Sequence, residues 1–469
     1  MTQHPVPRRL DNFLTARLSS SQFTWREIMN LTVPCVLDSL SIMFINMLIT
    51  MLISQNGETS MAAVSLAGPI GALISCLFNG LGAGGTVVVA QCCGKKDPVL
   101  VNRAIGMILW VIVLIGCLTC LPFLLFPGKI LTVLYPKAEA EVLSKASVYL
   151  FGNTLSILIF TVYSAIFCVL RGLGEAKKCL VLSIIINVAY LLFSILFLNF
   201  LHMDIQGSVI ALNLARLVGA LAAIASLFFI HPPVSMDIRH FFAYDHDLMR
   251  ATMQVSVPFG IEQICISCGS LVSQVYMITL GTTAVATQSI ANSLMGLLYC
   301  AASAIGNVSV AVVGRCIGAN RRDEAYTYGN RLNELTLILL VLSAVIFYPL
   351  LPPLLRQYKP SPEAYDMARK ILIASIPALL IFWPMSSTIP STLRSASDTV
   401  FPSVISLIVL WVVNTGLGYF LAIPMNMGLW GVWIATWLSW AIRTVCFYAR
   451  FRSKKWLNKA HLSKATQDV

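Results

Sequence analysis

The chain has 469 residues, of which 57% are hydrophobic and only 11% are charged. This composition excludes an ordinary soluble domain and indicates a protein that crosses a membrane many times. The net charge of +12 does not indicate nucleic-acid binding, because most lysines and arginines fall in short gaps between apolar runs, where they set orientation in the membrane.

About 20 apolar residues make one crossing of a bilayer, and the chain contains twelve such segments. In the first half they span residues 27–53, 61–90, 104–126, 144–170, 179–201 and 207–231. In the second half they span residues 251–279, 283–313, 329–351, 366–393, 401–422 and 427–449. The predicted fold is therefore an all-α integral membrane protein with two six-helix bundles. Its predicted parts are an N-terminal segment (1–26), a first lobe (27–231), a linker (232–250), a second lobe (251–449) and a basic tail (450–469).

The basic residues predict how these spans are oriented, because loops on the cytoplasmic side are rich in lysine and arginine. The N-terminus, the loops after even-numbered spans and the tail hold 23 of the 32 basic residues, whereas the opposite loops hold 7. We therefore predict a multi-pass protein of the cytoplasmic (inner) membrane with both termini and the linker in the cytoplasm.

Each half begins with a proline followed four residues later by an acid. The first pair is Pro34 and Asp38, and the second is Pro258 and Glu262, at an offset of 224 residues. The same offset holds without a gap across two stretches, residues 34–94 and 258–318. Since each half has an even number of spans, the two repeats have the same orientation and are related by a pseudo-twofold axis along the membrane normal.

The two acids lie near the middle of the bilayer. A helix that enters near Ile28 places Asp38 about 15 Å deep, and one that enters near Ala251 places Glu262 about 16 Å deep, in an apolar core of about 30 Å. Ionisable side chains at this depth are costly and mark functional sites, although a purely structural acid paired with its neighbours is the alternative. Such a carboxyl group can carry a proton or attract a cation. Asp38 and Glu262 are the predicted ion-coupling residues.

The two prolines remove a backbone donor one turn before each acid, which loosens the helix there. We predict a helix bend at Pro34 and Pro258 that moves during function, and a static kink is the alternative. Polar side chains at similar depth predict a substrate cavity, although each alone is more often an interhelical hydrogen-bonding group. These candidates are concentrated in the second half and comprise Gln263, Gln274, Gln288, Asn292, Asn307, Tyr299 and, from the first half, Asn187.

Two further features of the spans have structural interpretations. The run from Gly80 to Gly85 matches GxGxxG, but no strand precedes it and no acid follows at the required distance, so it predicts close helix packing and not dinucleotide binding. Arg216 lies nine residues inside the sixth span, too deep to be an anchor at the end of the helix. We predict that it pairs with an acid or with backbone carbonyls.

Several short stretches in a fixed order resemble the multidrug and toxic-compound extrusion (MATE) family. They are Ala62-Ala-Val-Ser-Leu, Gly84-Gly, Gln91-Cys-Cys-Gly-Lys, Leu170-Arg-Gly-Leu-Gly, Gly431-Val-Trp-Ile-Ala and Arg450-Phe-Arg-Ser-Lys-Lys-Trp456. The resemblance implies a V-shaped pair of helical bundles that exports organic cations in exchange for protons or sodium ions. Many relatives carry an acid fifteen residues after the first proline, and this chain has Ile49 there. Coupling is therefore expected to rest on Asp38 and Glu262.

The predicted function is secondary active export of an amphipathic, cationic organic compound in exchange for protons or sodium ions. The alternative is a flippase for a lipid-linked precursor. No P-loop, HExxH or GxSxG motif indicates an ATP-driven pump or an enzyme, and a repeated fold suits alternating access better than a channel. The expected partners are a small-molecule substrate and membrane lipids, with a monomeric protein, no nucleic acid and no cofactor besides the coupling ion. Amide replacements of either acid are expected to abolish transport and leave stability nearly intact.

Overall fold

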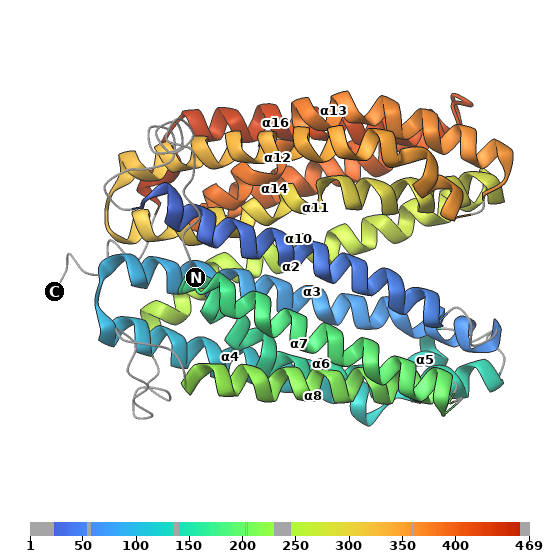
Figure 1. The fold of residues 1–469 in the computed structure, drawn as a ribbon, viewed down its shortest axis with the longest axis horizontal. Coiled ribbons are helices and arrows are strands. Elements are labelled where there is room, and N and C mark those ends of the chain that lie inside the picture. The colour runs from blue at the N-terminus through green and yellow to red at the C-terminus, as the bar shows by residue number, and fades with distance from the viewer. Residues whose placement is uncertain are drawn as a thin grey trace.

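The computed structural model describes residues 23–53, 58–134, 140–201, 203, 205–228, 245–358 and 360–459. Most of the predicted N-terminal segment and linker lies outside the described residues, and so does the side chain of Ile49. The described chain is helical throughout, and its helices form two bundles that lie side by side along the long axis of the molecule (Figure 1). The predicted all-α, two-bundle fold is confirmed.

The first half contains α2 (Trp25–Ile53), α3 (Glu58–Lys95), α4 (Pro98–Leu125), α5 (Pro127–Leu134), α6 (Ala140–Gly172), α7 (Ala176–Ser194), the π-helix η1 (Ile195–Phe200) and α8 (Ile205–Phe228). The second contains α10 (His246–Ile278), α11 (Thr282–Gly318), α12 (Arg322–Gln357), α13 (Pro362–Ser395), α14 (Val400–Ile408), η2 (Val409–Leu417), α15 (Gly418–Ala422), α16 (Leu429–Arg452) and η3 (Lys455–Asn458). In the described chain, 11 helical segments are long and apolar enough to cross a membrane. The less apolar α16, with 24 residues, is about 36 Å long and supplies the twelfth crossing.

Several helices begin four to six residues before the predicted spans, because polar caps lie outside the apolar windows. Asp97 caps α4 through hydrogen bonds from the Val99 and Leu100 amides at 2.9 and 3.3 Å. Asp245 caps α10 in the same way, and Ser361 precedes Pro362 at the first position of α13. A side-chain acceptor at the N-cap satisfies amides that have no partner inside the helix.

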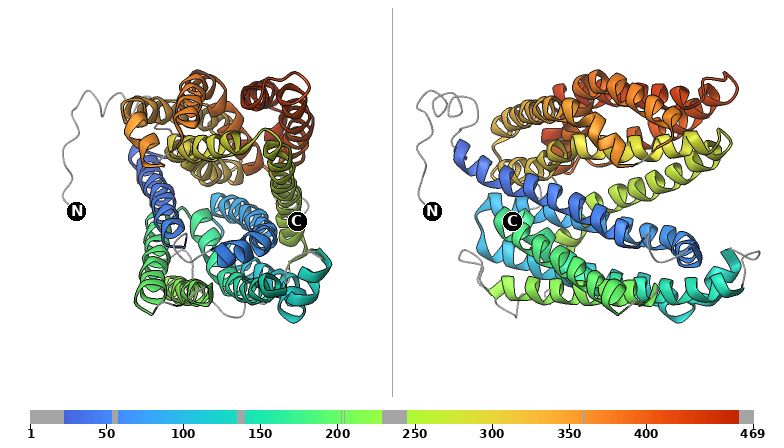
Figure 2. Two further views of the ribbon diagram at one scale, coloured as in Figure 1. Left: turned by 90° about the vertical axis from the view of Figure 1, so that its right-hand side faces the viewer. Right: turned by 45° about the vertical axis from the view of Figure 1, so that its right-hand side comes forward.

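The first helix of each half contacts both halves. Helix α2 packs against α7 of its own half and α11 of the other, while α10 packs against α14 of its own half and, most extensively, α3 of the other. Both helices run between the two bundles (Figures 1 and 2). The residues on α2 and α10 are therefore placed where the two halves can move against each other.

The internal repeat appears as a reciprocal contact between α3 and α11. A Cβ atom on Gly94 would strike the backbone of Arg315, and a Cβ atom on Gly318 would strike the backbone of Gln91. Both pairs of residues, Gly94 with Gly318 and Gln91 with Arg315, are separated by 224 positions. The repeat found in the sequence is thus a structural pseudo-twofold whose axis passes between these helices.

Replacing Gly318 by alanine is expected to push α3 and α11 apart and to destabilise the protein by about 1–3 kcal/mol, because the new methyl group meets backbone atoms that cannot rotate away. Gly68→Ala is the matched control, since its Cβ has no described neighbour within 4 Å. Thermal unfolding of the purified variants checks the prediction. An unfolding midpoint for Gly318→Ala equal to that of Gly68→Ala would contradict it.

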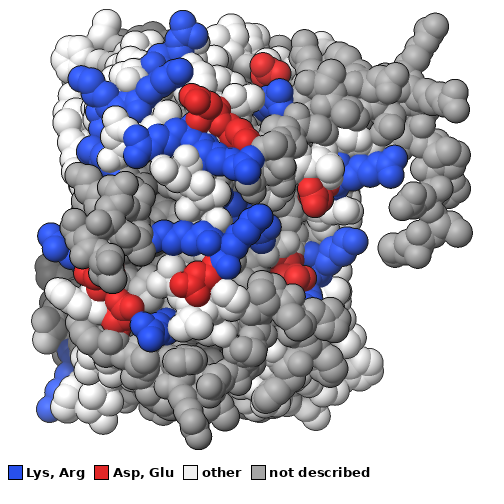
Figure 3. All heavy atoms as spheres, turned by 90° about the vertical axis from the view of Figure 1, so that its left-hand side faces the viewer, with Lys and Arg blue, Asp and Glu red and all other residues white. Residues whose placement is uncertain are grey.

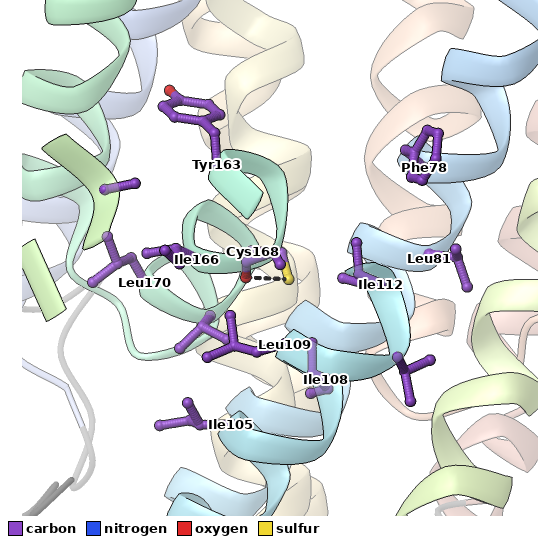
Figure 4. Close-up of a cluster of buried hydrophobic side chains, with 14 of the residues drawn as sticks. Phe78, Leu81, Ile105, Ile108, Leu109, Ile112, Tyr163, Ile166, Cys168 and Leu170 are labelled. Atoms are coloured by element: carbon purple, nitrogen blue, oxygen red, sulfur yellow. Dashed lines mark hydrogen bonds between the residues drawn. The ribbon is translucent and has the colours of Figure 1, made fainter. Parts of the chain in front are cut away.

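The glycine run of α3 packs tightly on both sides. Gly80 lies against Gly260 of α10, while Gly85 lies against Ile108 of α4 and Cys168 of α6. This arrangement confirms the predicted close packing. Figure 4 shows the neighbouring core, in which α4 packs against α6 and Tyr163 and Phe78 lie toward one end of the cluster.

The first part of the predicted tail belongs to the second lobe. The buried Asp398 carboxylate accepts from Arg450 Nε at 2.8 Å and from Lys459 Nζ at 3.0 Å. Trp456 is fully buried, stacks on Phe451 at 5.5 Å between ring centroids and donates its indole N–H to the Phe451 carbonyl. Residues 450–459 therefore anchor the end of α16 instead of extending into solvent.

Candidate functional site

A cavity of about 610 Å³ lies between the two halves, large enough for a drug-sized molecule. Helices α3, α6, α7 and α8 supply most of its lining, and α2, α10, α11 and α13 supply the rest. The cavity was predicted to lie in the second half because polar residues are dense in α10 and α11. The structure corrects this expectation, since residues of the first half form most of the wall.

Three arginines line this cavity, one each from α6, α8 and α13, whereas no aspartate or glutamate is among the described lining residues. Each guanidinium lies over an aromatic ring. Arg171 stacks on Phe167 at 4.7 Å, Arg216 on Phe160 at 4.8 Å and Arg394 on Phe259 at 4.3 Å from the ring centroid. These cation–π contacts fix the side chains and leave their edges available for polar groups.

Glu262 lies behind the wall and is held in a closed ion pair. Arg394 Nη2 donates to its Oε2 at 2.6 Å, and the Ser403 hydroxyl donates to the same oxygen at 2.7 Å. The side chains are only 5% exposed for Glu262 and 12% exposed for Arg394. Arg443 of α16 lies within electrostatic range of both. Glu262 therefore has two arginines around it.

Asp38 occupies the corresponding place in the first half. The Ser183 hydroxyl is hydrogen-bonded to its carboxylate, and Arg171 lies within electrostatic range. Arg171 does not close an ion pair, however, because its Nη1 donates to Asn307 Oδ1 at 3.2 Å. Asp38 Oδ1 is buried without a hydrogen-bond partner among the described residues. Asp38 faces a small pocket of about 10 Å³, a volume on the scale of a single water molecule.

The two acid sites occupy equivalent positions in the repeat but differ in whether the acid forms an ion pair with its arginine. Each combines an acid of the first helix, a serine of the fifth crossing and an arginine at the end of the fourth. In the second half the acid and the arginine are in contact, whereas in the first half they are apart. Arg171 and Asn307 line both the large cavity and the Asp38 pocket, so they connect this acid to the cavity.

Both predicted bend prolines lie inside continuous helices, Pro34 in α2 and Pro258 in α10. Each precedes its acid by one turn, as the spacing requires. The structure thus places a weakened turn beside each acid, and the predicted movement at these prolines stays a prediction.

The structure brings some of the predicted cavity residues together and leaves others apart. Gln263, Asn187 and Asn307 line the cavity. The remaining four do not. Gln274, Gln288 and Asn292 lie toward the α10–α11 turn, where Gln274 is exposed and Gln288 donates to Asn292 at 3.3 Å, while Tyr299, at the middle of α11, stacks on Trp383 at 5.1 Å. These four share α10 and α11 with the lining residues Gln263 and Asn307, so being on a lining helix does not by itself give a side chain access to the cavity.

Sequence reasoning missed two of the three cavity arginines. It assigned Arg171 and Arg394 to cytoplasmic loops, although each follows a leucine at the end of an equivalent crossing and this repetition was an available signal. It also predicted an acid or carbonyl partner for Arg216. That prediction is wrong, because Arg216 stacks on Phe160 and its buried Nη1 has no described hydrogen-bond partner.

A reciprocal pair of hydrogen bonds joins the two halves at one end of the molecule. Gln91 Nε2 of α3 donates to the Ser395 carbonyl at the end of α13, at 2.7 Å. Its repeat equivalent Arg315 of α11 donates to the Leu173 carbonyl at the end of α6. Lysines and arginines gather on the face of the molecule at this end (Figure 3). We call these contacts the latch.

Comparison with known proteins agrees with this architecture. The MatE family profile matches residues 34–197 and again residues 258–420, so the two matches begin 224 residues apart, at the offset of the internal repeat. The uncharacterized transporter YisQ of Bacillus subtilis is 24% identical, over 92% of this chain and 95% of its own. The probable multidrug resistance protein NorM of Thermotoga maritima is 22% identical, over 94% of each chain.

Solved structures share the fold. An outward-facing MATE family transporter of the MOP superfamily superposes with a TM-score of 0.84 at 18% identity, covering 92% of this chain and 96% of that one. A Pyrococcus furiosus MOP superfamily transporter, described by the reverse polarity of its binding pocket, superposes with a TM-score of 0.82 at 18% identity over the same shares. Together with the doubled profile match, the two lobes and the cavity between them, these comparisons show that the chain belongs to the MatE family of multidrug and toxic-compound extrusion transporters.

Proposed function

We propose that this protein is a secondary active antiporter that exports amphipathic organic compounds in exchange for protons or sodium ions. The observation that carries the proposal is the cavity between the two lobes, latched at one end and connected through Arg171 and Asn307 to the buried carboxylate of Asp38. Relatives such as the probable multidrug resistance protein YoeA of Bacillus subtilis, 23% identical, support export of organic compounds.

The latched end is the cytoplasmic side in this proposal. The basic residues that gather there (Figure 3) follow the rule that cytoplasmic loops are rich in lysine and arginine. The cavity then belongs to a state closed toward the cytoplasm. Both termini and the 232–250 linker are cytoplasmic in the same scheme.

Asp38 is the primary coupling residue in this proposal. Its unpartnered oxygen can accept a proton or a sodium ion without first breaking an ion pair, whereas Glu262 is already bound to Arg394 at 2.6 Å. A proton on Asp38 would change the charge next to Arg171 and Asn307, which also line the cavity. Ion binding and cargo binding are thereby coupled through two shared side chains.

The charge of the cavity lining is positive. Sequence reasoning predicted a cationic compound, yet the described lining contains three arginines and no acid. The same arginines also fit the alternative function, a flippase for a lipid-linked precursor, because arginine side chains bind the phosphate group of a phosphorylated lipid. Both functions require an amphipathic cargo in the cavity.

Everted membrane vesicles that contain the protein test the proposal. An imposed proton or sodium gradient is expected to drive uptake of at least one member of a labelled panel of cationic, anionic and neutral amphipathic compounds. Vesicles without the protein and vesicles with a collapsed gradient are the controls. Absence of gradient-dependent uptake for every compound, with correctly folded protein in the membrane, would overturn antiport.

A further inference from the structure

The charges around the cavity do not balance. Among the described residues, four partly buried arginines lie among the spans here, Arg171, Arg216, Arg394 and Arg443, against the two buried acids Asp38 and Glu262. Even with both acids ionised, two positive charges remain in excess, and uptake of a proton by either acid increases the excess. A cavity wall of this composition repels a cation at every stage and attracts an anion.

Arg216 makes this excess most evident, because no acid of the described residues forms an ion pair with it or lies within its electrostatic range. Its guanidinium stacks on Phe160, and its Nη1 atom is buried without a hydrogen-bond partner among the described residues. The titratable groups within electrostatic range are the hydroxyls of Tyr149 and Tyr190. A buried guanidinium usually pairs with a carboxylate or a phosphate. The described residues supply neither to Arg216, so we expect the partner to arrive with the cargo.

An aromatic row lies beside this charge. The rings of Phe160, Tyr163 and Phe167 on α6 stack with centroids 5.2 and 5.5 Å apart, and all three residues line the cavity. Arg216 lies at one end of the row and Arg171 at the other, through their contacts with Phe160 and Phe167. An apolar body can pack along the rings while an anionic group binds at either end.

We propose that the cargo is an amphipathic organic anion whose carboxylate, phosphate or sulfonate group binds Arg216 and whose apolar body lies on the Phe160–Tyr163–Phe167 row. The inference rests on the proposed transport function and specifies its substrate class. The anion can be a free organic acid or the phosphate head of a lipid-linked molecule. The chemistry at Arg216 is the same for both.

A pair of probes that differ only in charge tests the class: an anthracene carboxylate and the corresponding aminomethyl-anthracene, each titrated by fluorescence against the purified protein in nanodiscs. The carboxylate is expected to bind at least about tenfold more tightly than the amine. Arg216→Gln is expected to weaken carboxylate binding by about tenfold or more and to leave amine binding no weaker. Arg216→Lys keeps the charge but loses the forked set of donors, so its affinity for the carboxylate is expected to lie between that of the unmodified protein and that of Arg216→Gln.

Arg369→Gln is the matched control, because Arg369 is exposed at the other end of α13, and it is expected to leave both affinities unchanged. A second titration uses a fluorescent polyprenyl phosphate in the same nanodiscs, and its selective binding would assign the anion to a lipid. Tighter binding of the amine, or binding of either anion that Arg216→Gln does not weaken, would overturn the proposal. Selective anion binding without gradient-driven uptake in vesicles would instead refute the transport function alone.

Discussion

Replacing Asp38 by asparagine is expected to abolish gradient-driven transport, because coupling by a change of charge needs a group that can take up and release the ion. The amide keeps the size and the hydrogen bond of the carboxyl group but cannot change its charge. Since Asp38 has one oxygen without a partner and no closed ion pair, its loss costs little folding energy. The fold and cargo binding are expected to persist. Initial rates in everted vesicles, together with thermal unfolding of the purified variant, check both parts.

The control for this variant is Asp323→Asn, which makes the same chemical change at an exposed position in the first turn of α12. It is expected to transport at the original rate. Full transport by Asp38→Asn under both proton and sodium gradients would show that Asp38 is structural. Lost transport accompanied by a large fall in thermal stability would also argue against a coupling role.

Glu262→Gln is expected to destabilise the protein by about 3–5 kcal/mol, because it leaves a buried charge without its partner. This expectation replaces the earlier prediction that the amide leaves stability nearly intact, since the ion pair between Glu262 and Arg394 at 2.6 Å was not foreseen. Arg443 adds to the cost, because two guanidiniums would then face each other without a carboxylate. A lower midpoint of thermal unfolding for Glu262→Gln than for Asp38→Asn is the expected measurement.

The double variant Glu262→Gln with Arg394→Gln distinguishes the interaction energy of the ion pair from the separate contributions of the two side chains. The double variant removes both charges and leaves neither unpaired. Its loss in free energy of unfolding is therefore expected to be smaller than the sum of the losses in the two single variants, by about 0.5–3 kcal/mol, the usual interaction energy of contacting residues. Transport is expected to remain impaired, because the second acid site is lost. Additive effects of the two substitutions would mean that the ion pair contributes nothing to stability.

Much of the architecture follows from local features of the sequence. The doubled pattern that places Pro34 and Asp38 opposite Pro258 and Glu262 predicted the pseudo-twofold, because identical spacing on equivalent helices forces equivalent positions. Apolar length predicted the crossings, with errors of a few residues where caps such as Asp97 extend a helix beyond its apolar window. These properties depend on helix geometry and on transfer of side chains into lipid, both of which act over a few turns.

The chemistry of the site depends on contacts that no local pattern contains. An arginine at a helix end looks the same in the sequence whether it faces the cytoplasm or a cavity, and Arg171 and Arg394 face the cavity because of how the two lobes meet. The closed pair of Glu262 with Arg394 joins residues 132 positions apart, while its counterpart at Asp38 stays open. The sequence by itself determined the repeat, the crossings and the equivalent positions of the two acids. Only the tertiary structure decided the sign of the cavity charge and which acid is free, because both depend on distances between side chains of different helices.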